Sequence, residues 1–202
     1  MPPMFIVMSF SFGLAIFILV LMAAYHWSGR ELGDNVLSTL RNLLGVFVAG
    51  VLFFLLFYHL TNLYITKTHG VEKFLLVDGG VYTALFWFGQ IILGSLLPLA
   101  LIYAPSLRNS RKTLVLICAL IILGGLAQMY TIIIGGQAFP LAIFPGYEVS
   151  SSFYDGVVAN YAPSLPEVLL GLSGMAVAMA LLTFMIKVLR FLPSSLADSE
   201  LS

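Results

Sequence analysis

Charged residues are scarce in this chain. Charged residues make up 9% of the 202 residues, whereas hydrophobic residues make up 60%. In an average soluble domain about a quarter of the residues are charged. A soluble fold with the composition of this chain would leave much apolar surface in water. Nine basic residues balance nine acidic ones, which argues against the basic surface that nucleic-acid binding requires. We therefore expect a membrane protein with no nucleic-acid partner.

Cysteine and histidine are also scarce. The one cysteine, Cys118, lies inside an apolar run, where it serves neither an internal disulfide nor a metal cluster. Of the three histidines only His59 falls within an apolar stretch, whereas a bis-histidine haem needs two at similar depth. The patterns CxxC, CxxCH, HExxH, GxGxxG and the P-loop are missing. We predict neither haem nor metal in this chain and no catalytic centre of a soluble type.

Five apolar stretches are long enough to cross a bilayer, which takes about 20 helical residues. No charged residue interrupts their central parts, and none alternates in polarity as a barrel strand does. The stretches are approximately 5–25, 43–63, 81–103, 113–134 and 168–189. The sequence thus predicts an all-α, polytopic bundle of about five transmembrane helices over residues 1–192. Residues 193–202 are expected to form a frayed polar tail.

Basic residues indicate how the bundle is oriented. If five helices alternate, seven basic residues fall on one side and only Lys67 and Lys73 on the other. The seven are Arg30, Arg41, Arg108, Arg111, Lys112, Lys187 and Arg190. Because short cytoplasmic connections are rich in Lys and Arg, we predict the N-terminus outside and the C-terminus inside. A cleaved signal peptide is disfavoured, since no basic region precedes the first stretch and Tyr25-His26-Trp27 is typical of an interfacial anchor.

The outer connections carry further signals. The segment 135–167 is rich in Pro, Gly and aromatic residues, and we expect it to fold back onto the helix ends. We expect Ser164 to be the N-cap of the fifth helix. Glu167 then lies in the first turn, where a carboxylate is stabilised by the helix dipole, so it could have a structural role and not a chemical one. Residues 71–77 suit a short interfacial helix, and Asp78 after it suits a cap.

Polar side chains within or beside the spans are costly in lipid and are site candidates by default. With the predicted topology they gather towards the outer side. They are His59, Asn62, Asp78, Gln90, Gln128 and Glu167. A quinone site needs this chemistry, since quinol oxidation releases two protons and the ring oxygens need hydrogen-bond partners. In that reading His59 with Asp78 or Glu167 takes protons, and Asn62, Gln90 or Gln128 orients the ring. In the alternative reading, His59 and Asn62 only join helices.

Two segments carry a resemblance to a known family. Ile134-Gly135-Gly136-Gln137-Ala138-Phe139-Pro140, continued by Pro163-Ser164-Leu165-Pro166-Glu167, resembles the C-terminal half of the polysulfide-reductase membrane-subunit family, also called NrfD-like. The opening Pro2-Pro3-Met4-Phe5-Ile6-Val7 resembles the start of a later helix in those proteins. The similarity is closest to the ten-helix branch that includes the membrane subunits of hydrogenase-2 and of the sulfite-reductase complex.

The resemblance implies a multi-pass subunit of the prokaryotic plasma membrane that exchanges electrons between menaquinone and a partner. The implied partner is a ferredoxin-like iron–sulfur protein, alongside further oxidoreductase subunits. Family members are about twice as long, so the chain reads as a second half, a fragment or a short subunit whose missing N-terminal helices a separate chain supplies. Two rivals stay open: a proton- or ion-translocating subunit, and a structural membrane anchor without a pocket.

Overall fold

The computed structural model describes residues 2–107, 110–140, 156–159, 161–189, 192–193 and 195–200. In these ranges five helical segments are long and apolar enough to cross a membrane. They are Pro2–Ser28 (α1), Asp34–Tyr64 (α2), Val81–Tyr103, Arg111–Ala138 and Leu165–Val188 (α8). The predicted all-helical class and the number of spans are confirmed. The orientation of the termini in the membrane stays a prediction.

The third and fourth spans are composite helices. The third joins α4 (Val81–Ala84), a π-helix (Leu85–Leu96) and α5 (Leu97–Tyr103). The fourth joins α6 (Arg111–Tyr130), a π-turn (Thr131–Gly135) and α7 (Gly136–Ala138). The short elements between spans are the 3₁₀ turns Thr66–Thr68, Pro105–Leu107 and Asp198–Glu200, α3 (His69–Lys73) and the π-turn Phe74–Asp78. Wide π-turns are rare and often accompany functional sites.

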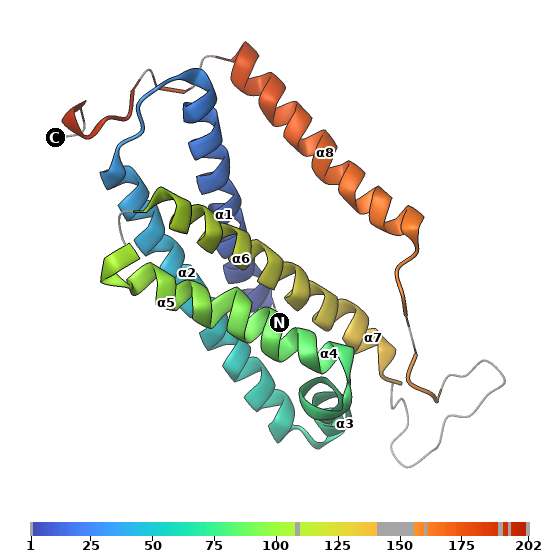
Figure 1. Ribbon diagram of the computed structural model, residues 1–202. Coiled ribbons are helices and arrows are strands. Elements are labelled where there is room, and N and C mark those ends of the chain that lie inside the picture. Colours follow the sequence, from blue (N-terminus) through green and yellow to red (C-terminus); the bar gives the residue numbers. More distant parts are fainter. Residues whose placement is uncertain are drawn as a thin grey trace.

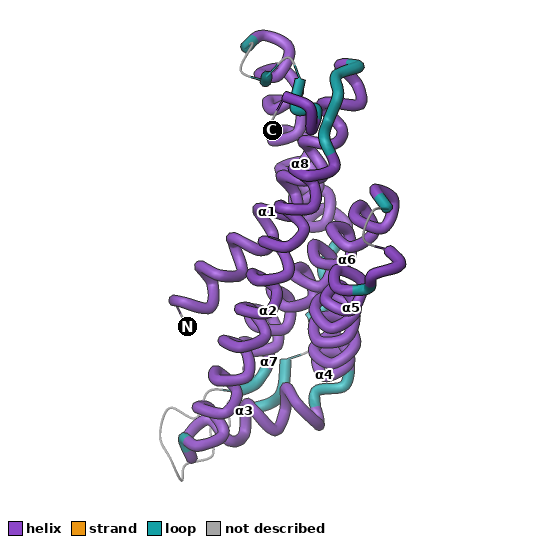
Figure 2. The backbone as a smooth tube through the Cα atoms, turned by 90° about the vertical axis from the view of Figure 1, so that its left-hand side faces the viewer, coloured by secondary structure: helices purple, strands orange, loops and turns teal. Residues whose placement is uncertain are grey.

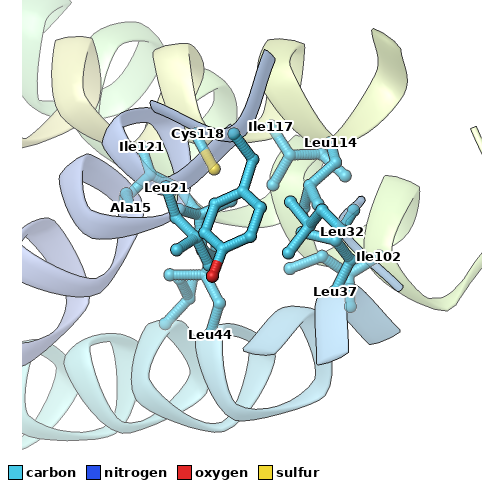
Figure 3. Packing of buried hydrophobic residues seen from close by; sticks show 13 residues of the cluster. Ala15, Leu21, Leu32, Leu37, Leu44, Ile102, Leu114, Ile117, Cys118 and Ile121 are labelled. Atoms are coloured by element: carbon cyan, nitrogen blue, oxygen red, sulfur yellow. The ribbon is translucent and has the colours of Figure 1, made fainter. Parts of the chain in front are cut away.

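Four spans form the bundle, and buried apolar side chains spaced along one face of each helix form its core. Figure 1 shows α1, α2, α5 and α6 grouped together, and Figure 2 shows α3 and α7 at the end opposite the C-terminal segment. The largest cluster centres on Tyr25, Leu44, Ile117 and Ile121, all at most 1% exposed (Figure 3). Cys118 lies in this cluster and is fully buried, as its apolar neighbours in the sequence predict.

Two glycines set the closest approach in the bundle. A Cβ added to Gly124 would lie 2.1 Å from the Gly94 Cα, and one added to Gly94 would lie 2.5 Å from the Gly124 Cα. The π-helix and α6 therefore pack backbone against backbone at this level, which is the usual role of small residues between membrane helices. By contrast, nothing lies within 4 Å of a Cβ added to Gly171 or Gly174 in α8.

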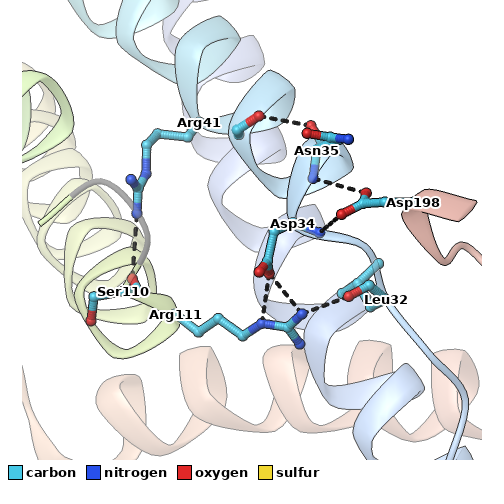
Figure 4. Close-up of polar contacts among 8 residues, drawn as sticks. Leu32, Asp34, Asn35, Arg41, Ser110, Arg111 and Asp198 are labelled. Atoms are coloured by element: carbon cyan, nitrogen blue, oxygen red, sulfur yellow. Dashed lines mark hydrogen bonds and ion pairs between the residues drawn. The ribbon is translucent and has the colours of Figure 1, made fainter. Parts of the chain in front are cut away.

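The end of the bundle at which the C-terminal segment lies is held by polar contacts (Figure 4). Arg111 donates two hydrogen bonds to the Asp34 carboxylate, at 2.8 and 3.1 Å, and another to the Leu32 carbonyl at 2.6 Å. Arg41, which is 3% exposed, donates to the Ser110 carbonyl. Three of the basic residues that predicted the inner side, Arg30, Arg41 and Arg111, thus also connect chain segments at this end.

The described part of the C-terminal segment is not frayed, which corrects the sequence prediction. The Gly33 amide donates to the Leu196 carbonyl at 2.8 Å, and the Leu196 amide donates to the Glu31 carbonyl at 3.0 Å. The Asp198 carboxylate accepts hydrogen bonds from the amides of Asp34 and Asn35, which begin α2. A carboxylate there accepts hydrogen bonds from amides that a helix N-terminus leaves without a partner. Since α2 has no side-chain cap of its own, Asp198 caps it, and this contact holds the tail against α2.

Helix α8 stands apart from the other four spans (Figure 1), and none of its residues is buried. Its N-cap is Ser164, which forms a capping box with Glu167, and the Ser164 amide donates to the Glu167 carboxylate at 2.8 Å. The predicted N-cap is thereby confirmed. Residues 141–155, which make up most of the connection before α8, lie outside the described residues. The expectation that this loop folds back onto the helix ends therefore stays a prediction.

Replacing Gly124 by Ala is expected to lower stability, because the new methyl group overlaps the Gly94 backbone. Overpacking of this kind costs about 1–3 kcal/mol. Thermal unfolding in one detergent, followed by tryptophan fluorescence, measures the effect. Gly171→Ala is the matched control and should leave the midpoint unchanged, since open space surrounds it. Equal midpoints for the two variants would contradict the close crossing.

Cysteine labelling tests the predicted orientation. In a Cys118→Ser background, Lys67→Cys and Ser106→Cys each place a thiol at an exposed position, at opposite ends of the bundle. We expect a membrane-impermeant maleimide to label the Lys67→Cys thiol in intact cells and the Ser106→Cys thiol only after permeabilisation. The reverse pattern would show the N-terminus inside.

Candidate functional site

A tight turn at the C-terminal end of α2 creates the site. After Tyr64 the chain reverses through Thr66–Thr68, and α3 returns alongside the last turns of α2. The Thr68 hydroxyl donates to the Asn62 carbonyl at 2.6 Å, and the His69 Nε2 hydrogen-bonds the Leu63 carbonyl. These bonds use carbonyls that the end of a helix leaves open, and they fix α3 against α2.

The returning helix places one carboxylate against two polar side chains of α2. Glu72 Oε2 lies 2.6 Å from His59 Nδ1, and the Asn62 Nδ2 donates to Glu72 Oε1, also at 2.6 Å. The Glu72 side chain is 1% exposed and that of His59 is 12% exposed. His59 and Asn62 lie three residues apart and share one helix face. Both oxygens of a buried carboxylate are therefore engaged from a single face of α2.

Two aromatic rings lie against His59 in this group, which we call the Glu72 triad (His59, Asn62 and Glu72). The His59 ring meets the Phe86 ring edge to face, with centroids 4.8 Å apart, and the Tyr58 ring at 5.0 Å. Phe86 belongs to the π-helix of the third span. The triad thus lies between α2, α3 and the third span, where a buried carboxylate needs hydrogen-bond partners from the protein.

The triad has the chemistry of a proton acceptor. A carboxylate hydrogen-bonded to an imidazole exchanges one proton between two sites, and the partly exposed ring connects it to its surroundings. The Asn62 amide holds the second oxygen, which fixes the orientation of the carboxylate. Within the described ranges, no group of three His, Cys, Asp or Glu residues could hold a metal ion.

Asp78 and Glu167 do not join His59, contrary to the sequence hypothesis. The Asp78 carboxylate is half exposed and pairs with Lys73 Nζ at 3.2 Å, and Gly80, at φ +56°, is the residue that caps the third span. The Glu167 carboxylate binds the Ser164 amide and accepts a hydrogen bond from the Tyr161 hydroxyl at 2.9 Å. That bond raises the pKa of Tyr161. Both carboxylates have surface partners of their own.

Gln90 and Gln128 come together elsewhere, deeper in the bundle. Each is 2% exposed, and both line a small cavity between α1, the π-helix and α6. Gln128 Nε2 lies 3.1 Å from Met8 Sδ. The six predicted residues therefore separate into His59 with Asn62, Gln90 with Gln128, and two surface carboxylates.

Glu72 is the residue that the sequence analysis passed over. It follows His69 and Gly70 in a polar connection next to Lys73, where a carboxylate is expected to face water. The available signal was its spacing, because Glu72 lies three residues before Leu75 and therefore on the apolar face of the predicted short helix. Leu75 is buried, as is Glu72.

An all-helical bundle whose five described spans are long and apolar enough to cross a membrane, with one buried carboxylate bonded to a histidine, defines a polytopic membrane protein. The chain matches the family described as "Polysulphide reductase, NrfD" over residues 1–142. It therefore belongs to that family, and the resemblance noted in the sequence is confirmed.

One curated relative extends the comparison. The chain is 29% identical over 199 residues to the "Hdr-like menaquinol oxidoreductase integral membrane subunit" of Archaeoglobus fulgidus. The alignment covers 94% of this chain and 48% of that protein, so the chain spans about half the length of the relative. No solved structure matches the chain.

A double-mutant cycle tests whether the triad acts as a unit. His59→Ala, Glu72→Ala and the double variant should show a coupling of about 1–3 kcal/mol in unfolding, because removing either partner leaves the other buried without its bond. The control cycle uses Lys73→Ala and Asp78→Ala, an exposed pair whose coupling should stay below about 1 kcal/mol. Equal coupling in the two cycles would contradict the buried contact.

Proposed function

We propose that this chain is the quinone-interacting membrane subunit, or half of it, of a respiratory oxidoreductase complex. In this role it exchanges electrons between the menaquinone pool and an iron–sulfur partner. The observation that carries the proposal is the buried Glu72 carboxylate, hydrogen-bonded to His59 and Asn62 in a chain of the polysulphide reductase family. The name of the relative, a menaquinol oxidoreductase subunit, supports the substrate class.

The reaction assigns a part to each group. Oxidation of one quinol to a quinone breaks two O–H bonds and releases two protons and two electrons. The electrons pass to the iron–sulfur partner. The protons leave one at a time through the Glu72–His59 pair, with His59 as the more exposed member that passes them on. Asn62 positions the carboxylate, and we confine the proton-handling part to these three residues.

The other predicted residues receive different parts. Asp78 and Glu167 stabilise the outer turn and the start of α8, where their partners lie. Gln90 and Gln128 line a cavity whose space for the centre of a water molecule is about 10 Å³, whereas a drug-sized ligand occupies hundreds of Å³. We do not place a quinone ring there.

The partner proposal rests on the chain's length and on α8. The relative is about twice as long, and α8 is an apolar span without a buried residue. We propose that helices equivalent to the relative's other half, in the same or a separate chain, cover α8 and complete the quinone pocket. The iron–sulfur subunit docks at the outer end, near the triad.

A structural anchor is the second candidate function, and one observation favours it. Both Glu72 oxygens are hydrogen-bonded within the chain, as expected for a group that only holds α3 to α2. The two functions predict different outcomes when Glu72 is made neutral without a change of shape, because an amide keeps the packing but cannot take up a proton at neutral pH.

We expect Glu72→Gln to lower menaquinol oxidation by roughly 10²-fold, the usual contribution of a general base, in the assembled complex reconstituted in vesicles. His59→Ala should act in the same direction. The measurement is turnover per assembled complex, with subunit content quantified after purification. Glu31→Gln removes an exposed carboxylate at the inner end and is the matched control, with turnover unchanged.

Assembly distinguishes the two functions. Normal assembly with turnover lost in Glu72→Gln supports proton handling by the triad. Normal assembly with unchanged turnover would remove the triad from the mechanism and leave the anchor. A complex that no longer assembles would show that the group is structural.

A further inference from the structure

A second polar group lies in the middle of the bundle, away from the Glu72 triad. It consists of Ser11 on α1, Gln90 and Ser95 on the π-helix, and Gln128 on α6, each at most 4% exposed. All four line one cavity, with Val48 and Val51 of α2 on its wall. Val51 lies eight residues before His59, a rise of about 12 Å along α2. The two polar groups are therefore separate.

Backbone packing explains why a cavity exists here. Gly94 and Gly124 bring the π-helix and α6 into direct contact, and the Phe12 ring lies over Gly125, 2.4 Å from where its Cβ would be. Backbones this close leave no room for large side chains at the crossing, and the polar side chains next to it do not fill the remaining volume. The space open to the centre of a water molecule is about 10 Å³, close to the least that holds one water.

The hydrogen bonds of this group are incomplete. Ser95 Oγ donates to the Gln90 carbonyl at 3.0 Å, and Gln128 Nε2 donates to Met8 Sδ, a weak acceptor. Gln90 Nε2 is buried and has no hydrogen-bond partner among the described residues. An amide left in this state inside an apolar bundle costs free energy, and the cavity it lines gives room for a partner.

We propose that this cavity binds a single water molecule between α1, the π-helix and α6. The water accepts a hydrogen bond from Gln90 Nε2 and donates to the oxygens that line the same space, on Gln128 and Ser11. Water suits the site because it both donates and accepts, and because a buried water needs two to four polar partners. The inference does not depend on the proposed function, since no quinone or proton transfer enters it.

The bound water has a structural consequence. It joins three helices through hydrogen bonds at a level where lipid supplies none. The π-helix contributes two of the four polar residues, Gln90 and Ser95, and their backbone-to-side-chain bond spans five residues, the spacing of a π-turn. The π-helix therefore provides both the wide turn and two of the polar side chains that line the cavity.

Water-edited solid-state NMR tests the proposal on the full chain in lipid vesicles. The glutamines of the chain are Gln90, Gln128 and Gln137, so selective ¹⁵N labelling of glutamine side chains gives few signals, and Gln90→Met assigns one of them. We expect water protons to transfer polarisation to the Gln90 amide. Exposed Gln137 is the positive control. Transfer to Gln137 without transfer to Gln90 would overturn the proposal.

Stability gives an independent test through the sign of its change. Methionine has nearly the shape of glutamine but no hydrogen-bond donor to offer the water. If the cavity is hydrated, Gln90→Met lowers the apparent Tm by a few degrees, because the water loses a partner. If the cavity is dry, the same change removes an unsatisfied amide and raises the Tm. An unchanged or higher Tm would contradict the water site, and Gln137→Met is the control without effect.

Discussion

Lipid offers no hydrogen bond to a peptide group, and the architecture of this protein follows from that constraint. Every span is helical because a helix satisfies its backbone internally, and departures from the α-helix keep this property. The π-turns of the third and fourth spans stay helical, with hydrogen bonds that reach one residue further. The same constraint applies to side chains, so each polar group inside the bundle needs a partner from its own helix, from another helix or from water.

The polar groups meet this demand in different ways at different depths. At the end that holds the C-terminal segment, the exposed side chains of Arg111 and Asp34 bind each other, and the Asp198 carboxylate binds the start of α2. At the opposite end the Glu72 carboxylate is buried, with both oxygens engaged by His59 and Asn62. In the middle, Gln90 finds no partner among the described side chains. The Glu72 triad differs from the other groups because it combines a buried carboxylate with a partly exposed imidazole ring.

The sequence predicted the local features well. Apolar length placed all five spans, and Ser164 was identified as a cap because its hydrogen bond lies within one helical turn. The spacing of His59 and Asn62 placed them on one face. The sequence suggested Asp78 or Glu167 as their partner, whereas in the structure it is Glu72. Glu72 reaches the pair because Thr68 and His69 fix the turn after α2. The tail was also misjudged, because its order comes from α2 and not from its own residues.

By itself the sequence determined that the chain is a helical membrane bundle and how many apolar spans it has. These properties depend on hydrophobic length and residue type, which are local along the chain. Only the tertiary structure decided that Glu72 joins His59, that Gln90 and Gln128 share a cavity, and that α8 lies apart from the other spans. Such pairings depend on how helices cross and where turns reverse, and single positions such as Gly94 and Gly124, where the absence of a side chain lets two backbones meet, set that geometry.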